Sequence, residues 1–497
     1  MIGGRGQLLA SLALYLGVSA LWSWPVLGDP LGLVGARQVE GLALPWLATE
    51  PLGLVTVGSA FPAGEPIFAA DGMGLWLAAQ LLTPLGGPTA ASALFSLIGP
   101  ALSALIADRA AVAWGARWPW SLVAGLAFGF SSLMAAALLG GRAYAAFDPW
   151  APLMLMALVP PAPPNVRLVA LAAVGAVVTS SQATLSTGIV LGALLLAAAG
   201  RGEWRRPHLV ALVAAMVALA LAFSAHIVFG QPALGQATLA GLLAWSAKPD
   251  LLGGSVAPVL PFTAVILSGF AASGLHCHRR LVALGVLGIV SALMVDGSIL
   301  PAAFLAFGVA GAQAATAAGA NRWSPLLLAG GLSDAIVGSG TPLRVDAVPF
   351  ALPSAYLLAP SGPLLELYAP GAHSTAPGQL TCGYAAFHRR PLLGSCATTP
   401  GPDDRRAILA DWVARQVFAG ATGWSGALAA RGVAGVVLHP SWYVGAEGAA
   451  IGVGLQSALG SPVSQSEDAG DPVLIFAVPG HIATRSEALS AWRQELP

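Results

Sequence analysis

Long apolar segments follow one another along the first two thirds of the chain, with short polar stretches between them. A helix needs about 20 consecutive apolar residues to cross a membrane, and most of these segments approach that length. The pattern predicts a polytopic α-helical membrane protein with about eleven transmembrane helices. The expected helices lie near residues 7–25, 88–107, 120–139, 150–162, 168–182, 184–200, 209–228, 256–275, 281–295, 299–318 and 324–340.

The pattern changes at about residue 342, where charged residues return and the apolar runs become short. Buried strands are expected at 364–370, 433–439 and 472–478, and a helix at 403–421. We therefore expect a transmembrane domain in residues 1–341 and a small α/β domain in residues 342–497.

Composition supports a membrane protein. Hydrophobic residues make up 56% of the chain and charged residues 9%, with a mean hydropathy of +0.77. Soluble domains contain about 25% charged residues. The 22 Lys and Arg residues balance 22 Asp and Glu residues, so nothing indicates attraction to nucleic acid, and membrane lipid is the expected surrounding.

The charges also predict an orientation, because cytoplasmic loops of membrane proteins are rich in Lys and Arg. With the N-terminus in the cytoplasm, the inner loops contain Arg5, Arg109, Arg117, Arg167, Arg201, Arg205, Arg206, Arg279, Arg280 and Arg322, together with Asp108 and Glu203. The outer interhelical loops contain three basic residues, Arg37, Arg142 and Lys248. Their other charged residues are acidic. An odd number of helices then predicts that the C-terminal domain is extracytoplasmic.

The first outer loop, residues 28–87, is too long for a tight connection. Its segments 36–48 and 72–85 each have an apolar face, which is typical of helices that lie in the membrane interface. Between them FPAGEP, residues 61–66, is rich in turn-forming residues. The pattern predicts a loop that covers a cavity at the membrane surface.

The order of several segments resembles a known family. A first helix ends in an aspartate, Asp29, and the long first outer loop follows with its FPxG turn. Further along the chain come GLAFGFSS (125–132), DPWAPLMLMAL (148–158), WSAKPDLLGG (245–254), GPLLELYAP (362–370), PLLGSC (391–396) and RGVAGVVLHPSWY (431–443). The chain resembles the polytopic glycosyltransferases of the GT-C fold, specifically bacterial membrane proteins related to mannosyltransferases and arabinosyltransferases.

The resemblance implies an activity and a location. Such proteins transfer a sugar from a polyprenyl-phosphate-linked donor to an envelope glycan, lipid or protein acceptor at the outer face of the bacterial cytoplasmic membrane. The alternative is a catalytically inactive GT-C-like component that binds or assembles envelope polysaccharide. A transporter is less favoured, because the predicted helices contain few charges and no internal repeat.

Asp29 matches the acidic residue that this resemblance places at the start of the first outer loop. A carboxylate there can take the proton of an acceptor hydroxyl as the glycosidic bond forms. The alternative is that Asp29 ends a helix beneath Trp22 and Trp24, where a polar residue costs little.

A second acid is expected in the second outer loop, and Asp148 matches it. Because Pro149 follows Asp148, capping of a helix start is the favoured alternative for this residue. Glu40 is a further candidate, with a solvated face of an interfacial helix as its alternative. No pair of adjacent acids occurs in either loop, which leaves open whether a divalent metal such as Mg or Mn is needed.

The resemblance also requires a cation for the phosphate of the donor. Arg37, Arg142 and Lys248 are the candidates, since arginine gives bidentate phosphate contacts and lysine a point charge. Contact with lipid headgroups is the alternative for each. His226, near the outer end of its helix, is a further cavity candidate.

The C-terminal domain carries a polar set that the resemblance places above the cavity, where it would shape acceptor binding. The set comprises Glu366, Tyr368, His388, Arg389, Arg390 and His439. No nucleophile motif or phosphate-binding loop occurs there, so we expect no independent catalysis. Cys382 and Cys396 are either a disulfide or two free thiols.

Overall fold

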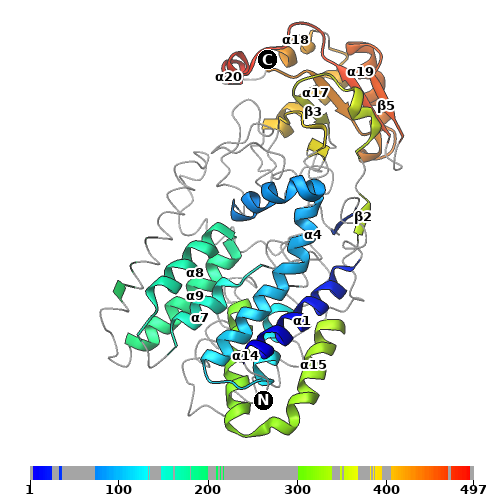
Figure 1. Ribbon diagram of the computed structural model, residues 1–497. Coiled ribbons are helices and arrows are strands. Elements are labelled where there is room, and N and C mark those ends of the chain that lie inside the picture. The colour runs from blue at the N-terminus through cyan, green and yellow to red at the C-terminus, as the bar shows by residue number, and fades with distance from the viewer. Residues whose placement is uncertain are drawn as a thin grey trace. The chain divides into compact units, whose positions relative to one another are not determined.

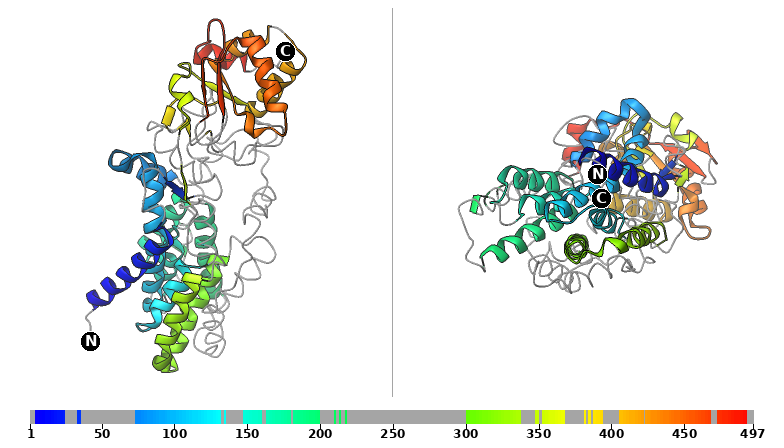
Figure 2. Two further views of the ribbon diagram at one scale, coloured as in Figure 1. Left: turned by 90° about the vertical axis from the view of Figure 1, so that its right-hand side faces the viewer. Right: turned by 60° about the horizontal axis from the view of Figure 1, so that its bottom comes forward.

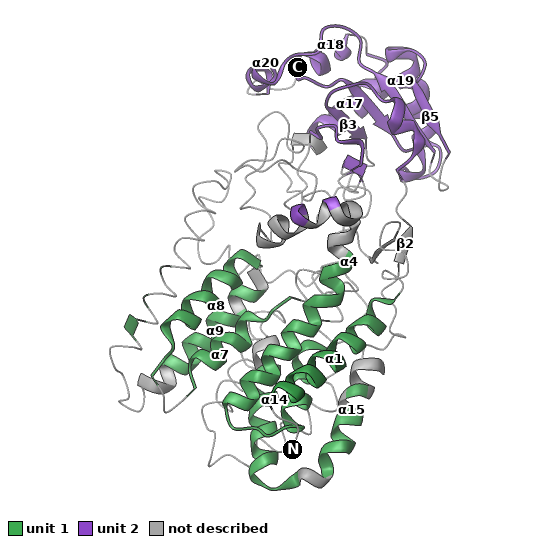
Figure 3. Ribbon diagram, viewed as in Figure 1, with its two compact units in different colours: residues 1–37, 71–78, 92–348 green, residues 38–70, 79–91, 349–497 purple. Residues whose placement is uncertain are grey.

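The computed structural model describes residues 4–24, 33–35, 73–131, 134, 147–159, 163–179, 181–199, 209, 210, 213, 217, 300–337, 347–349, 352–367, 381, 384–385, 387–393, 405–421, 423–467 and 472–492. The chain divides into two compact units (Figure 3). Unit 1 comprises residues 1–37, 71–78 and 92–348, and unit 2 comprises residues 38–70, 79–91 and 349–497.

The described part of unit 1 is mainly helical (Figure 1). Its helices include α1 (Gly4–Trp22), α5 (Trp120–Gly129), α7 (Trp150–Ala157), α8 (Val166–Thr179), α9 (Ser181–Ala199), α14 (Leu300–Ala317) and α15 (Ser324–Val337), and most of α4 (Met73–Ala113). Helices α7, α8 and α9 pack on one another, and α14 packs on α5 and α9 (Figures 1 and 2). Short strands β1 (Leu33–Gly35) and β2 (Ala347–Pro349) form a two-stranded sheet.

Helices α1, α8, α9, α14 and α15 overlap the predicted segments 7–25, 168–182, 184–200, 299–318 and 324–340, whereas α5 ends at Gly129 and α7 at Ala157, before the predicted ends at 139 and 162. The predicted helices 209–228, 256–275 and 281–295 and the interfacial helix 36–48 lie largely outside the described residues. A further difference concerns α4. The sequence predicts an interfacial helix at 72–85 and a separate helix at 88–107, whereas the structure contains one continuous helix, α4. Alanine-rich sequence after Pro88 favours the helix, and prolines are tolerated in apolar helices whose neighbours satisfy the freed backbone groups. Among the described residues, the segment Ala93–Ala113 of α4 is long and apolar enough to cross a membrane.

Small residues allow the helices of unit 1 to approach closely. A Cβ atom at Gly129 would lie 2.5 Å from the Cβ of Ala104 and 2.7 Å from the carbonyl oxygen of Pro100. A Cβ at Gly125 would lie 2.7 Å from the carbonyl oxygen of Ala104. Since van der Waals packing drives helix association in membranes, these two glycines fix the contact between α5 and α4.

Unit 2 contains a four-stranded sheet with the order β3-β4-β6-β5. The strands are β3 (Leu364–Leu367), β4 (Gly435–Leu438), β5 (Ser464–Ser466) and β6 (Val473–Ala477). Strands β3 and β4 are parallel, and β6 is antiparallel to both β4 and β5. The first two strands and β6 occupy the short apolar runs of the sequence, which agrees with strands buried on both faces.

Helices surround this sheet within unit 2. They are α17 (Arg405–Phe418), α18 (Trp424–Ala430), α19 (Glu447–Leu459) and α20 (Arg485–Ala491), with the short 3-10 helices η7 (Ser354–Leu358) and η9 (Pro440–Trp442). Helix α17 packs on α19 and β3, and it lies within the predicted helix 403–421. The parallel arrangement brings the carboxyl ends of β3 and β4 to one edge of the sheet, where polar side chains gather.

Candidate functional site

Asp148 is the predicted catalytic residue that falls among the described residues. It precedes helix α7, and its side chain is 1% exposed. The hydroxyl of Ser186 on α9 donates to its Oδ2 at 2.6 Å, and the backbone N–H of Ala151 donates to its Oδ1 at 3.3 Å. Its own backbone N–H donates to the hydroxyl of Ser103 on α4 at 2.9 Å. Both carboxylate oxygens therefore accept hydrogen bonds from the protein.

The contact with Ser103 sets the depth of Asp148 in the bundle. Ser103 is the central residue of the apolar segment Ala93–Ala113, and the other end of α7 is tied to the end of α4, where the indole of Trp114 donates to the carbonyl of Leu155 at 2.9 Å. The backbone of Asp148 therefore contacts α4 at the middle of this segment, and its predicted place in the second outer loop stays a prediction.

Packing next to Asp148 holds the start of α7. The indole of Trp150 donates to the hydroxyl of Thr179 on α8 at 2.7 Å, and the ring lies against Gly175, where a Cβ atom would collide with it. The hydrogen bond from Ala151 is the kind made by a residue that caps a helix start. This geometry agrees with the capping alternative for Asp148, and its catalytic role stays a prediction.

The metal requirement that the sequence leaves open is not decided by the described residues. Among them, no group of three or more His, Cys, Asp or Glu side chains is placed to hold an ion. Each oxygen of Asp148 accepts one hydrogen bond, from a hydroxyl or from an amide N–H, and keeps a further lone pair.

The other predicted site residues lie outside the described residues. They are Asp29, Arg37, Glu40, Arg142, His226 and Lys248, and the same holds for Tyr368, Cys382 and Cys396. Whether they meet at one cavity stays a prediction.

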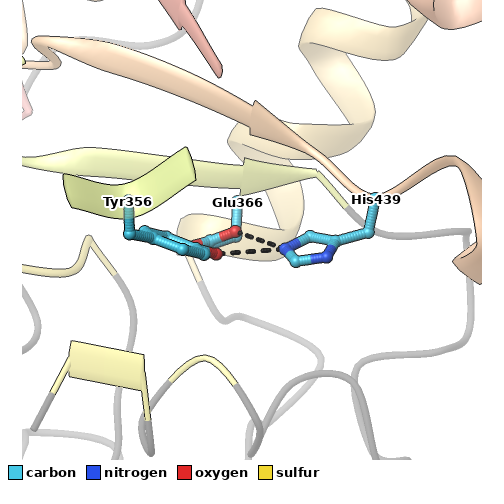
Figure 4. A network of polar contacts seen from close by, with 3 residues as sticks. All are labelled: Tyr356, Glu366 and His439. Carbon is cyan, nitrogen blue, oxygen red and sulfur yellow. Dashed lines mark hydrogen bonds and ion pairs between the residues drawn. The ribbon is translucent and has the colours of Figure 1, made fainter. Parts of the chain in front are cut away.

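A second polar cluster lies in unit 2, at the carboxyl edge of β3 and β4 (Figure 4). The hydroxyl of Tyr356 donates to Oε1 of Glu366 at 2.9 Å and lies 3.1 Å from Nε2 of His439. Nε2 of His439 lies 3.3 Å from Oε2 of Glu366. All three side chains are at most 1% exposed, so the network is closed to solvent and each oxygen of the carboxylate has a partner.

The fold explains how these three residues meet. Glu366 lies on β3 in register with Val437 of β4, and His439 comes directly after Leu438 at the end of β4. Tyr356 comes from η7, which Arg390 holds in place because its guanidinium donates to the carbonyl oxygens of Tyr356 and Ala359.

Aromatic rings enclose the cluster. The ring of His439 stacks on Trp442 with centroids 3.6 Å apart, and the ring of Tyr356 stacks on His388 at 5.0 Å. Burial, followed by the charge of Arg390, lowers the pKa of His388 to about 3, so this imidazole is neutral at pH 7. Its Nδ1 accepts the backbone N–H of Arg390 at 3.0 Å.

The sequence identified part of this cluster. Glu366, His388, Arg390 and His439 belong to the predicted polar set, and the structure brings them together, while Arg389 is exposed. Tyr356 was not predicted, because PSAYLLAP carries no periodic pattern and no charge. Tyr356, Glu366 and His439 are buried and join three segments at the sheet edge, whereas His388 and Arg390 are partly exposed.

No protein-family model and no curated protein matches this chain. Solved structures do match. The cryo-EM structure of arabinofuranosyltransferase AftD from Mycobacteria superposes with a TM-score of 0.63 at 18% identity, over 97% of this chain and 40% of that one. Its mutant R1389S, class 2, gives 0.60 at 18% identity, over 97% and 42%. The chain has a GT-C-like glycosyltransferase fold.

The oligosaccharyltransferase of Archaeoglobus fulgidus, solved in complex with Zn and sulfate, matches with a TM-score of 0.44 at 11% identity, over 90% of this chain and 70% of that one. That score is too low to support an argument. This chain spans about two fifths of the length of the arabinofuranosyltransferase. These matches establish the fold, and a fold does not by itself fix an activity.

Proposed function

We propose that this chain is a membrane glycosyltransferase that transfers a sugar from a polyprenyl-phosphate-linked donor. The acceptor is an envelope glycan, lipid or protein at the outer face of the bacterial cytoplasmic membrane. The observation that supports this proposal is the match of 97% of the chain to the solved structure of an arabinofuranosyltransferase. Polyprenyl-phosphate arabinose is therefore the first donor to test, and polyprenyl-phosphate mannose the second.

In this proposal Asp29 is the general base. A carboxylate within hydrogen-bond reach of the acceptor hydroxyl removes its proton while the oxygen attacks the anomeric carbon and the lipid phosphate leaves. Arg37, Arg142 and Lys248 stabilise the negative charge on the leaving phosphate. Glu40 and His226 complete the lining of the cavity.

The proposed reaction also requires a defined orientation of the protein in the membrane. We infer that residues 1–341 form the transmembrane domain with the N-terminus in the cytoplasm, and that residues 342–497 lie outside. Alkaline phosphatase is active outside the cytoplasm, whereas green fluorescent protein matures inside it. A phosphatase fused after residue 497 should be active, and a fluorescent fusion at the same position should be dark. The reverse pattern would contradict the orientation.

The test of the activity uses the full-length protein in lipid nanodiscs with a radiolabelled donor and an envelope extract as acceptor. Asp29→Asn should abolish transfer, whereas Glu487→Gln, an exposed helix-capping change in unit 2, should retain it. Both variants should elute as the wild type does on size exclusion. Normal transfer by Asp29→Asn would remove the assignment of the base.

The alternative is a catalytically inactive GT-C-like component of envelope polysaccharide assembly. It is favoured by the placement of Asp148, whose carboxylate is used within the bundle. Under this alternative, Asp29→Asn complements a deletion strain fully, while removal of residues 349–497 does not.

A further inference from the structure

Helix α4 carries a charged pair inside its apolar segment. The sequence predicts Asp108 and Arg109 in an inner loop, whereas the structure includes both in α4, within Ala93–Ala113. Asp108 is 0% exposed, and the Nη2 atom of Arg109 donates to its Oδ2 at 2.8 Å. In the described part of the chain, Oδ1 of Asp108 and Nε of Arg109 are buried and have no hydrogen-bond partner.

Arg109 and Asp108 make one of the two hydrogen bonds that a guanidinium and a carboxylate can form side by side. Nε–H and Nη2 donate from the same edge of a guanidinium, and a carboxylate facing that edge normally accepts both bonds. Here one bond is made, which leaves a buried donor and a buried acceptor beside each other. An unsatisfied buried polar group costs about 1–3 kcal/mol, and more when it is charged.

Two buried hydroxyls are in the same condition. Ser11 on α1 and Ser121 on α5 are each 0% exposed, and neither hydroxyl has a partner among the residues described. They come from two different helices that both pack against α4.

The contact between α5 and α4 brings Ser121 to Asp108. Gly129 meets Pro100 and Ala104, and Gly125 meets Ala104, so the two helices run antiparallel. Extending this register by one turn on each helix, we infer that Ser121 on α5 lies opposite Asp108 on α4.

Helix α1 packs along α4 and also contacts α5. The hydroxyls of Ser19 and Ser23 donate to carbonyl oxygens of α4, at Leu97 and at Ser96. The hydroxyl of Tyr15 donates to the carbonyl of Leu122 on α5 at 3.3 Å. Ser11 lies one turn before Tyr15 on this face, and so it points to the level of Asp108.

The four groups match the hydrogen-bonding capacity of one water molecule. Oδ1 of Asp108 accepts, Nε–H of Arg109 donates, and the hydroxyls of Ser11 and Ser121 do either. A water molecule offers two hydrogens and two lone pairs, and buried waters make about three such bonds. A cation is disfavoured, because the charge of Asp108 is already neutralised by Arg109.

We propose that α1, α4 and α5 enclose a binding site for an ordered water molecule, which bridges Asp108 and Arg109 and is held by Ser11 and Ser121. The water completes the ion pair and satisfies the polar groups that each helix contributes. It thereby links three helices at the depth of the charged pair.

Serine-to-alanine variants test this proposal, because a dry and a hydrated site respond with opposite signs. In a dry site, removal of an unsatisfied hydroxyl is neutral or stabilising. In a hydrated site, Ser11→Ala and Ser121→Ala each remove a partner of the water and should lower the Tm of the full-length protein by about 2 °C. The double variant should lower it by less than the sum, since both hydroxyls hold one molecule.

Thr187→Val on α9 is the matched control. Its buried hydroxyl also has no partner among the described residues, so an isosteric apolar replacement should leave Tm unchanged or raise it. A high-resolution cryo-EM map of the wild type in nanodiscs should show a density peak within hydrogen-bond distance of Oδ1 of Asp108. An unchanged or raised Tm in both serine variants, or an empty map at that position, would overturn the proposal. A Tm that falls when sodium is replaced by N-methylglucamine would overturn it in favour of a cation.

Discussion

Nε2 of His439 lies 3.3 Å from Oε2 of Glu366, although 72 residues lie between them in the sequence. Glu366 is on β3, and His439 follows β4. The parallel pairing of the two strands creates this proximity. The hydroxyl of Tyr356 contacts both side chains and completes the network. A buried carboxylate needs hydrogen-bond donors, and here a tyrosine and a histidine supply them. The sheet edge thus depends on a residue from each of three segments.

Tyr356→Phe should destabilise unit 2. The change removes one hydroxyl and leaves Oε1 of Glu366 without its donor, at a side chain that is 1% exposed. We expect a loss of about 1–3 kcal/mol in the free energy of unfolding, because the cost is that of an unsatisfied buried acceptor. Chemical denaturation of the full-length protein, followed by tryptophan fluorescence, measures it.

The control is a double-mutant cycle with Glu366→Gln. If the two side chains interact, the effects of the single changes will not add. Additive effects would contradict the network.

The stability of the protein should fall below neutral pH because of His388. In the unfolded chain a histidine has a pKa of about 6.5, whereas in the folded protein burial and Arg390 lower the pKa of His388 to about 3. The unfolded state therefore binds a proton first as the pH falls. The contribution is fully present above pH 6.5 and is lost progressively down to about pH 3.

His388→Asn should reduce this pH dependence, because asparagine keeps an acceptor for the backbone N–H of Arg390 and does not titrate. The measurement is the difference in Tm between pH 7.5 and pH 5. His481→Asn, at a side chain that is 83% exposed, is the control and should behave as the wild type does. An equal loss in wild type and His388→Asn would show that this imidazole is not responsible.

Much of unit 2 could be predicted from the sequence, because its strands are near-continuous apolar runs. Leu364–Leu367, Gly435–Leu438 and Val473–Ala477 are largely buried, and such strands stand out between polar segments. Helix α17 was equally visible from its spacing. By contrast, η7 spans five residues without periodicity, so nothing local indicated that Tyr356 would reach Glu366.

In unit 1 the approximate positions of the described helices follow from hydropathy, but the contacts between them do not. Hydropathy treats each segment alone, whereas the position of Asp148 depends on the hydroxyl of Ser103, far away in the chain. For the same reason Asp108 and Arg109 were expected in a loop, since two adjacent charges end an apolar run in any sequence window. Contacts between helices allow them to stay inside it.

Ser186→Ala should destabilise unit 1. The hydroxyl of Ser186 donates to the carboxylate of Asp148 at 2.6 Å, and its removal leaves a buried oxygen without that donor. The expected loss is about 1.5–3 kcal/mol, the range for hydrogen bonds to charged groups. Thermal unfolding in nanodiscs measures the effect.

Asp148→Asn separates the structural role from a catalytic one. An asparagine oxygen still accepts the N–H of Ala151 or the hydroxyl of Ser186, so we expect a small change in Tm and retained sugar transfer. Loss of transfer at an unchanged Tm would instead assign Asp148 to the reaction. The pair of readouts therefore decides between capping and catalysis.

Gly129→Ala should loosen the contact between α5 and α4. The new Cβ would lie 2.5–2.7 Å from Ala104 and from the carbonyl oxygen of Pro100, and backbone atoms of a packed helix give way only when the helix moves. Overpacking of this kind costs about 1–3 kcal/mol.

Gly192→Ala on α9 is the matched control, since nothing lies within 4 Å of its added Cβ and alanine favours the helix by about 0.5–1 kcal/mol. We therefore expect opposite signs in thermal unfolding of the two variants. Equal Tm shifts would mean that the antiparallel contact through Gly129, on which the position of Ser121 opposite Asp108 also depends, is not present in the folded protein.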